Sequence, residues 1–122
     1  MTPKQFQKLV DRDVCCLHCG ETERISPNHR ANRGMGGSKA LDRPSNLIVL
    51  CSEMNSLIES NWFHALLAKE YGWKLERWQV PEDEPVFDSR LWKWFKLDND
   101  FNRVPIDMPK PIARSKYENP LD

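Results

Sequence analysis

Apolar positions in this chain recur at helical spacing in two stretches. The first follows Thr2-Pro3 and extends to about Asp11; the pair suits a helix start because Thr caps the helix and Pro tolerates its first turn. The second has Ser52 as its cap and Gly72 as its stop, with a break expected near Asn61. The positions expected on its buried side are Leu57, Ile58, Phe63, Leu66 and Leu67.

Strand-like runs lie between and after these helices. Arg24–Pro27 and Asn46–Leu50 predict two strands, the second because it is short, apolar and partly β-branched. Trp73–Val80 is apolar at roughly every second position, and Arg90–Leu97 alternates with large residues on both faces. A polar turn then leads to Phe101–Ile106, the expected return strand of a hairpin, whose proline keeps it at a sheet edge.

This order of elements predicts a small α+β protein. A chain of 122 residues fits one domain, and we expect that domain over residues 1–106. Its core is expected at about 15–62 and a β-rich extension at about 73–106. From residue 107 to 122, three prolines and the lack of periodicity predict an extended tail.

The charges of the chain are balanced overall but unevenly distributed along it. The formal net charge is zero, which gives no global electrostatic reason to bind nucleic acid. Five basic residues nevertheless lie between Arg24 and Arg43 against one acid, Asp42. That segment fits a phosphate-binding face, although a solvated loop explains the same charges. No apolar run reaches the ~18 residues of a bilayer span, and the N-terminus lacks a secretory signal's apolar stretch, so we expect a cytoplasmic protein.

Candidate chemistry gathers in residues 26–61. Hydrolysis of a phosphodiester needs a base and a cation, and His29 suits the base because its unperturbed pKa is ~6.5. The amide oxygens of Asn28 and Asn55 can hold a hard cation such as Mg²⁺. Neighbours in a strand point to opposite faces, so Asn28 and His29 can share a site only at a bulge or a strand end. Each residue alone has an ordinary structural role, and only the combination indicates a site.

The same segment resembles the HNH endonucleases. Their ββα-metal, treble-clef-like fold places a histidine at the end of the first strand, an asparagine in the loop and a third His or Asn on the helix. The matching residues in this H-N-N version are His29, Asn46 and Asn55. The glycine-rich loop Arg33–Ser38 and the strand Asn46–Cys51 are similar to small HNH proteins of bacteriophages and prophages. The resemblance covers about residues 16–61, and the extension matches much more loosely.

The resemblance implies a metal-dependent DNA endonuclease that leaves 5′-phosphate and 3′-hydroxyl ends. In that reading His29 activates water, Asn46 holds the loop, and Asn28 and Asn55 bind the metal. Oxygen ligands favour Mg²⁺ or Mn²⁺ over Zn²⁺. Glu59, one helical turn beyond Asn55, either adds charge there or is a surface acid. The DNA phosphates would meet Arg30, Arg33 and Lys39. Phage terminase and packaging proteins are the implied partners.

The cysteines raise a separate question. Without a secretion signal, four cysteines indicate thiols or metal ligands rather than disulfides. Many HNH relatives hold a structural zinc with two C-x2-C pairs, but here Met54 stands where the fourth cysteine would be. A structural zinc on Cys16, Cys19 and Cys51 therefore needs Cys15, His18 or water to complete it. The alternative is a cluster of buried thiols without zinc.

Two other functions fit parts of the pattern. One is a non-catalytic DNA-binding module on the same scaffold, and the other is a zinc-knuckle interaction protein. His29 argues against both, because neither needs a base at that position. No element resembles a sequence-reading helix, so low DNA sequence specificity is expected.

Overall fold

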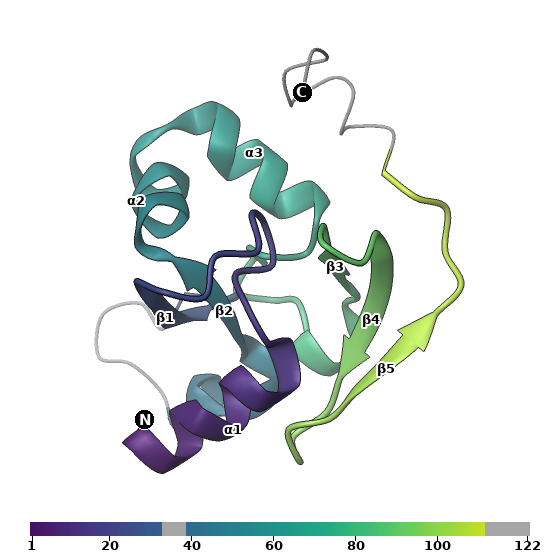
Figure 1. Ribbon diagram of the computed structural model, residues 1–122. Helices are drawn as coiled ribbons and strands as arrows, with labels where there is room; N and C mark the ends of the chain where they lie inside the picture. The colour runs from purple at the N-terminus through teal and green to yellow at the C-terminus, as the bar shows by residue number, and fades with distance from the viewer. Residues whose placement is uncertain (33–38, 112–122) are drawn as a thin grey trace.

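The structure, a computed structural model, describes residues 1–32 and 39–111, which form an α+β fold (Figure 1). The helices are α1 (Pro3–Asp13), α2 (Ser52–Ser60) and α3 (Trp62–Glu70), and the strands are β1 (Ile25–His29), β2 (Leu47–Cys51), β3 (Val86–Asp88), β4 (Lys93–Leu97) and β5 (Arg103–Ile106). Short 3-10 turns are η1 (Lys39–Asp42), η2 (Pro44–Asn46) and η3 (Pro81–Asp83). Within the described residues, no helix is long and apolar enough to cross a membrane.

The first sheet is the antiparallel pair β1–β2, in which Ile25 lies opposite Cys51 and His29 opposite Leu47. The chain passes from β2 directly into α2, so the order is strand, strand, helix (Figure 1). The cap of α2 is Cys51 rather than the predicted Ser52, since its Sγ accepts from the Met54 N–H at 3.3 Å. Asn55 therefore occupies the fourth helical position, where a cap at Ser52 would have made it the third.

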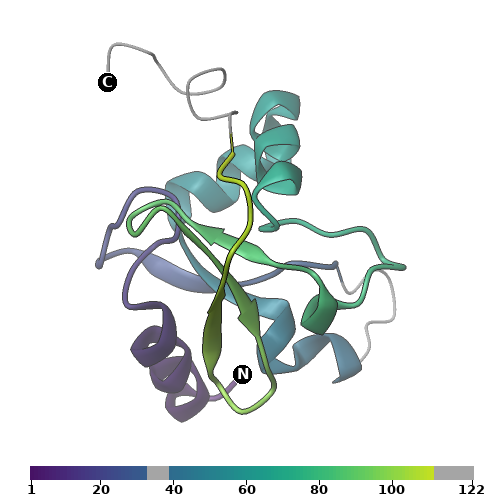
Figure 2. The same ribbon diagram turned by 90° about the vertical axis from the view of Figure 1, so that its right-hand side faces the viewer.

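Strand β2 is buried on both faces, which its continuous apolar run allows. Leu47 and Val49 pack with Leu9 of α1, while Ile48 and Leu50 belong to the larger core under α2. This division follows from the alternation of side chains along a strand. Figures 1 and 2 accordingly show α1 and the α2–α3 pair on opposite sides of the first sheet.

A buried ion pair fixes the end of α1 against β2. The Arg12 guanidinium bonds Asp13 at 2.7 Å and donates to the Leu47 carbonyl at 2.5 Å. Asp13 Oδ2 in turn accepts the Val49 N–H at 3.0 Å. These contacts extend the helix two residues beyond the predicted end. The predicted Thr2 cap is confirmed, as part of a capping box with Gln5.

The second helical stretch breaks at Asn61, as predicted, because Asn61 Oδ1 accepts the N–H groups that open α3. Gly72 ends it with φ of +75°, and an added Cβ would lie 2.0 Å from the Pro85 carbonyl oxygen. Of the predicted buried positions, Ile58 and Leu67 are buried. Leu66 is 40% exposed, so its predicted burial is wrong.

The second sheet has the order β3–β4–β5. It contains the predicted hairpin, with Pro105 on the edge strand β5, and adds the short β3, which was not predicted. The predicted strand Trp73–Val80 is wrong: that segment makes only an isolated bridge through Leu75. Its alternation does not reflect burial in a sheet, since Trp78 is 79% exposed. Trp73 is buried and donates its indole N–H to the Phe87 carbonyl, so the two sheets share one core.

A carboxylate within η3, that of Glu82, makes the stability of the fold sensitive to acid. Glu82 pairs with Arg43 and accepts the Ser45 hydroxyl at 2.5 Å. The hydrogen bond from Arg43 is the main cause that lowers the pKa of Glu82 to about 2. Because the folded pKa lies below the unfolded value, this contribution is present above about pH 5 and is lost as the pH falls towards 2.

We therefore expect Glu82→Gln to lower the free energy of unfolding by about 1–2 kcal/mol at pH 7, a figure reduced for the partial exposure of the pair, and to change it little at pH 2. Urea unfolding at both pH values measures the difference. Glu23→Gln is the matched control, since Glu23 is exposed. An equal effect of the two substitutions at pH 7 would contradict the assignment.

Candidate functional site

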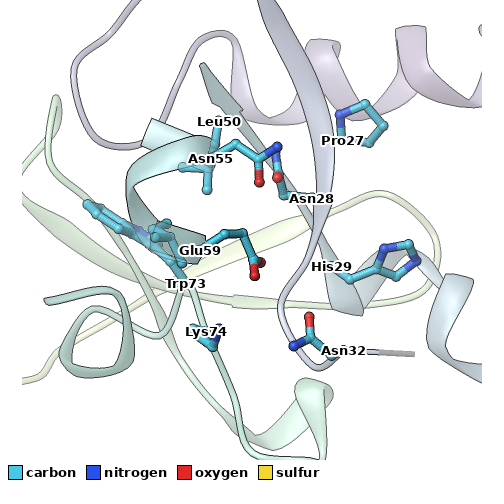
Figure 3. A pocket seen from close by; sticks show the side chains of 10 residues that line it. Pro27, Asn28, His29, Asn32, Leu50, Asn55, Glu59, Trp73 and Lys74 are labelled. Atoms are coloured by element: carbon cyan, nitrogen blue, oxygen red, sulfur yellow. The ribbon is translucent and has the colours of Figure 1, made fainter. Parts of the chain in front are cut away.

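A hollow at the end of β1 brings together residues from β1, α2 and the segment after α3 (Figure 3). Its polar lining residues are Asn28, His29, Asn32, Asn55, Glu59 and Lys74. Its volume is about 170 Å³. At about 30 Å³ per water, that suits a hydrated ion or one phosphate group better than a whole nucleotide.

Asn28 and Asn55 face each other across the hollow from β1 and α2 (Figure 3). Asn28 donates its amide nitrogen to the Ser26 carbonyl at 3.0 Å, which leaves its oxygen as the group available to a ligand. Glu59 follows Asn55 by one helical turn, so the two share a face of α2, and its carboxylate extends into the same space. Two amide groups and a carboxylate thus line the same hollow, and their oxygens are the ligands that hard divalent cations prefer.

His29 is the last residue of β1, which is how it lines the same hollow as Asn28 despite the alternation of strand side chains. Figure 3 shows its ring on the other side of β1 from Asn55. Its Nε2 lies 2.8 Å from Asp42 Oδ1, in η1. Because a carboxylate accepts, this contact assigns the proton to Nε2 and leaves the Nδ1 lone pair free to take a proton.

Asp42 was not predicted as a site residue. The available signal was its position as the one acid within the basic segment from Arg24 to Arg43. The contact explains that position, since the carboxylate holds the ring of His29 in one orientation.

Asn46 holds the two ends of the loop between the strands. Its side chain is fully buried, accepts the Ala31 N–H at 2.8 Å, and donates to the carbonyls of Ala31 and Leu41 at 3.0 and 2.8 Å. Its own carbonyl accepts the Arg30 N–H at 2.8 Å. These bonds are of the kind expected for a residue that holds the loop; the Asn46 side chain does not line the hollow.

The predicted DNA contact of Arg30 is wrong. Its side chain is fully buried, and its guanidinium donates to five backbone carbonyls at 2.6–3.3 Å. The accepting residues are Ser45, Gly72, Pro81, Glu84 and Pro85. Burial, and next the charge of Arg12, lower the pKa of Arg30 to about 10, so it remains a cation at neutral pH. Arg33 and the side chain of Lys39 lie outside what the structure describes.

The cysteines form a second candidate centre, away from the hollow. The Sγ atoms of Cys16, Cys19 and Cys51 all lie within 4.8 Å of one another and can bind a metal such as zinc. Cys15 and His18 do not belong to this group, and His18 stacks edge-on against Trp73. Burial raises the pKa of each of the three thiols, so metal binding here must displace protons.

Comparison with known proteins adds no assignment: the chain matches no protein-family model, no curated protein and no solved structure. The function is therefore inferred from the hollow and the cysteine cluster themselves.

Proposed function

We propose that this protein is a metal-dependent HNH endonuclease that hydrolyses DNA phosphodiester bonds to 5′-phosphate and 3′-hydroxyl ends. The observation that carries the proposal is that His29, Asn28 and Asn55 all line one hollow at the end of β1. The strand–strand–helix order of β1, β2 and α2 supports a ββα-metal core.

The oxygen ligands at the hollow fit Mg²⁺ or Mn²⁺. Asn28 and Asn55 would hold the ion, as the sequence predicts, and Glu59 supplies the negative charge that two amides lack. When bound, such an ion stabilises the negative charge that develops on the phosphate oxygens. All three ligands are weak or partly exposed, so the affinity for the ion alone is expected to be low.

The chain's own residues account for the proton that the attacking water loses; the 3′-oxygen that leaves as the P–O bond breaks takes its proton from solvent water. His29 takes a proton from the attacking water at Nδ1, while Asp42 accepts the hydrogen bond from Nε2–H and stabilises the imidazolium that forms. Asn46 keeps the loop closed beside this histidine. We also propose that the protein is encoded by a phage and acts beside the terminase. This part of the proposal is based on the resemblance to phage HNH proteins.

The proposal predicts that the purified protein nicks or linearises supercoiled plasmid with Mg²⁺ or Mn²⁺, less well with Zn²⁺, and not at all in EDTA. Gel electrophoresis of the plasmid measures the rates. Because EDTA can also strip the cysteine cluster, circular dichroism must show a folded protein in that sample. Restoration of cleavage by added Mg²⁺ completes the control. A folded protein that binds DNA but cuts it with none of these ions contradicts the enzymatic reading.

A second candidate is favoured by the Cys16–Cys19–Cys51 cluster: a zinc-knuckle module that binds DNA or protein without cutting. Metal analysis of the protein purified without chelator separates the two. One zinc per chain in a protein with no cleavage supports the module. Zinc together with Mg²⁺-dependent cleavage assigns the cysteines a structural role beside a separate active site.

A further inference from the structure

Lys74 is placed at the hollow by backbone contacts on both of its sides. Its own N–H donates to the Ala68 carbonyl at 3.2 Å, at the end of α3. The N–H of Leu75 donates to the Arg30 carbonyl at 2.7 Å, and Leu75 forms a parallel bridge with Ala31. The chain that carries Lys74 is thus tied to the residues that directly follow His29.

The charge of Lys74 has no acidic partner within the described residues. Lys69, on α3, shows the contrast, because its Nζ lies 3.0 Å from Glu76. Lys74 is half-buried and lines the hollow together with Glu59, yet the two form no ion pair. In the view of Figure 3, Glu59 lies between Lys74 and the two asparagines.

We propose that Lys74 binds the DNA phosphate that enters the hollow, an inference that rests on the proposed function. A divalent cation held by Asn28, Asn55 and Glu59 repels the Lys74 ammonium, and a phosphate between them attracts both. Both charges would therefore favour a phosphate at the hollow. Lys74 takes the role that buried Arg30 cannot perform.

The test compares Lys74→Gln with Lys96→Gln, which removes the same charge from an exposed position on β4 outside the hollow. Binding of a fluorescent 20-base-pair duplex is measured by anisotropy at several KCl concentrations, without added divalent ions. One lost phosphate contact lowers the slope of log K against log salt by about 1. We expect this change, with several-fold weaker binding at 50 mM KCl, for Lys74→Gln and not for Lys96→Gln. Lys74→Arg is expected to keep the wild-type slope.

Equal slopes for Lys74→Gln and Lys96→Gln overturn the inference, as does a wild-type protein that does not bind the duplex. Rescue by Lys74→Arg excludes a folding defect as the cause of the lost contact. The proposed function fails separately. If binding depends on Lys74 but no metal supports cleavage, the phosphate contact stands and the nuclease does not. If the protein cuts DNA and Lys74→Gln has the wild-type salt slope, the nuclease stands and the contact does not.

Discussion

His29→Ala is expected to slow plasmid cleavage by roughly 10²–10⁴-fold, the usual contribution of a general base, while DNA affinity and stability stay near wild type. Cleavage should be lost without a loss of stability because the His29 side chain makes few contacts that stabilise the fold. Its side chain is 31% exposed, and its polar contact in the described residues is with Asp42, itself 41% exposed. Loss of such a surface pair changes the free energy of unfolding by at most about 1 kcal/mol.

Two further variants sharpen this test. His64→Ala removes a histidine of α3 that does not line the hollow, and it should leave the rate unchanged. Asp42→Ala keeps the base but releases its ring, so it should lower kcat less than His29→Ala does and change DNA affinity little. A wild-type rate for His29→Ala, or a parallel loss of cleavage, binding and melting temperature, would show that His29 is not the base.

Arg30→Met is expected to lower the free energy of unfolding by about 3–5 kcal/mol, a large share of the total stability of a small domain. Methionine preserves much of the buried volume but has no donor. Five carbonyls that accept from the guanidinium would lose that partner, and each buried unpaired acceptor costs about 1–3 kcal/mol unless water reaches it. The fold is affected broadly because these carbonyls lie in η2, at Gly72 and in residues 81–85, so Arg30 joins the segment that precedes β2 to the segments that precede β3.

Urea unfolding followed by tryptophan fluorescence measures this loss. Arg24→Met is the matched control, since the Arg24 side chain is 73% exposed, and it should change the free energy of unfolding by less than about 0.5 kcal/mol. Arg30→Lys keeps the charge but has only three donors without the planar fork, so an intermediate loss is expected. A folded Arg30→Met protein with near wild-type stability and weakened DNA binding would restore the phosphate role first predicted for this arginine.

Helix ends that depend on a single residue were predictable from the sequence. The start of α1 depends on the Thr2 cap, and the break at Asn61 depends on the side-chain oxygen of that residue. The stop at Gly72 depends on a positive φ, which glycine adopts readily. The hairpin followed from strand alternation around a polar turn. Trp73–Val80 has a similar alternation, but Trp73 is buried against Tyr71 and donates to the Phe87 carbonyl, while Trp78 is exposed to solvent. Periodicity alone did not distinguish these two environments.

At the candidate site, the residue types and their order along the chain could be read from the sequence: His29 beside Asn28, Asn46 at the loop end, and Asn55 in the first turns of α2. Which charges reach the hollow depends on the tertiary structure. It buried Arg30 among carbonyls, because that guanidinium can satisfy five acceptors from segments that are distant in sequence. It also brought Lys74 to the hollow, although Lys74 lies 45 positions after His29, because the Ala31–Leu75 bridge joins the two segments. A charge pattern cannot distinguish these outcomes, because burial of a charge depends on partners that are distant in sequence.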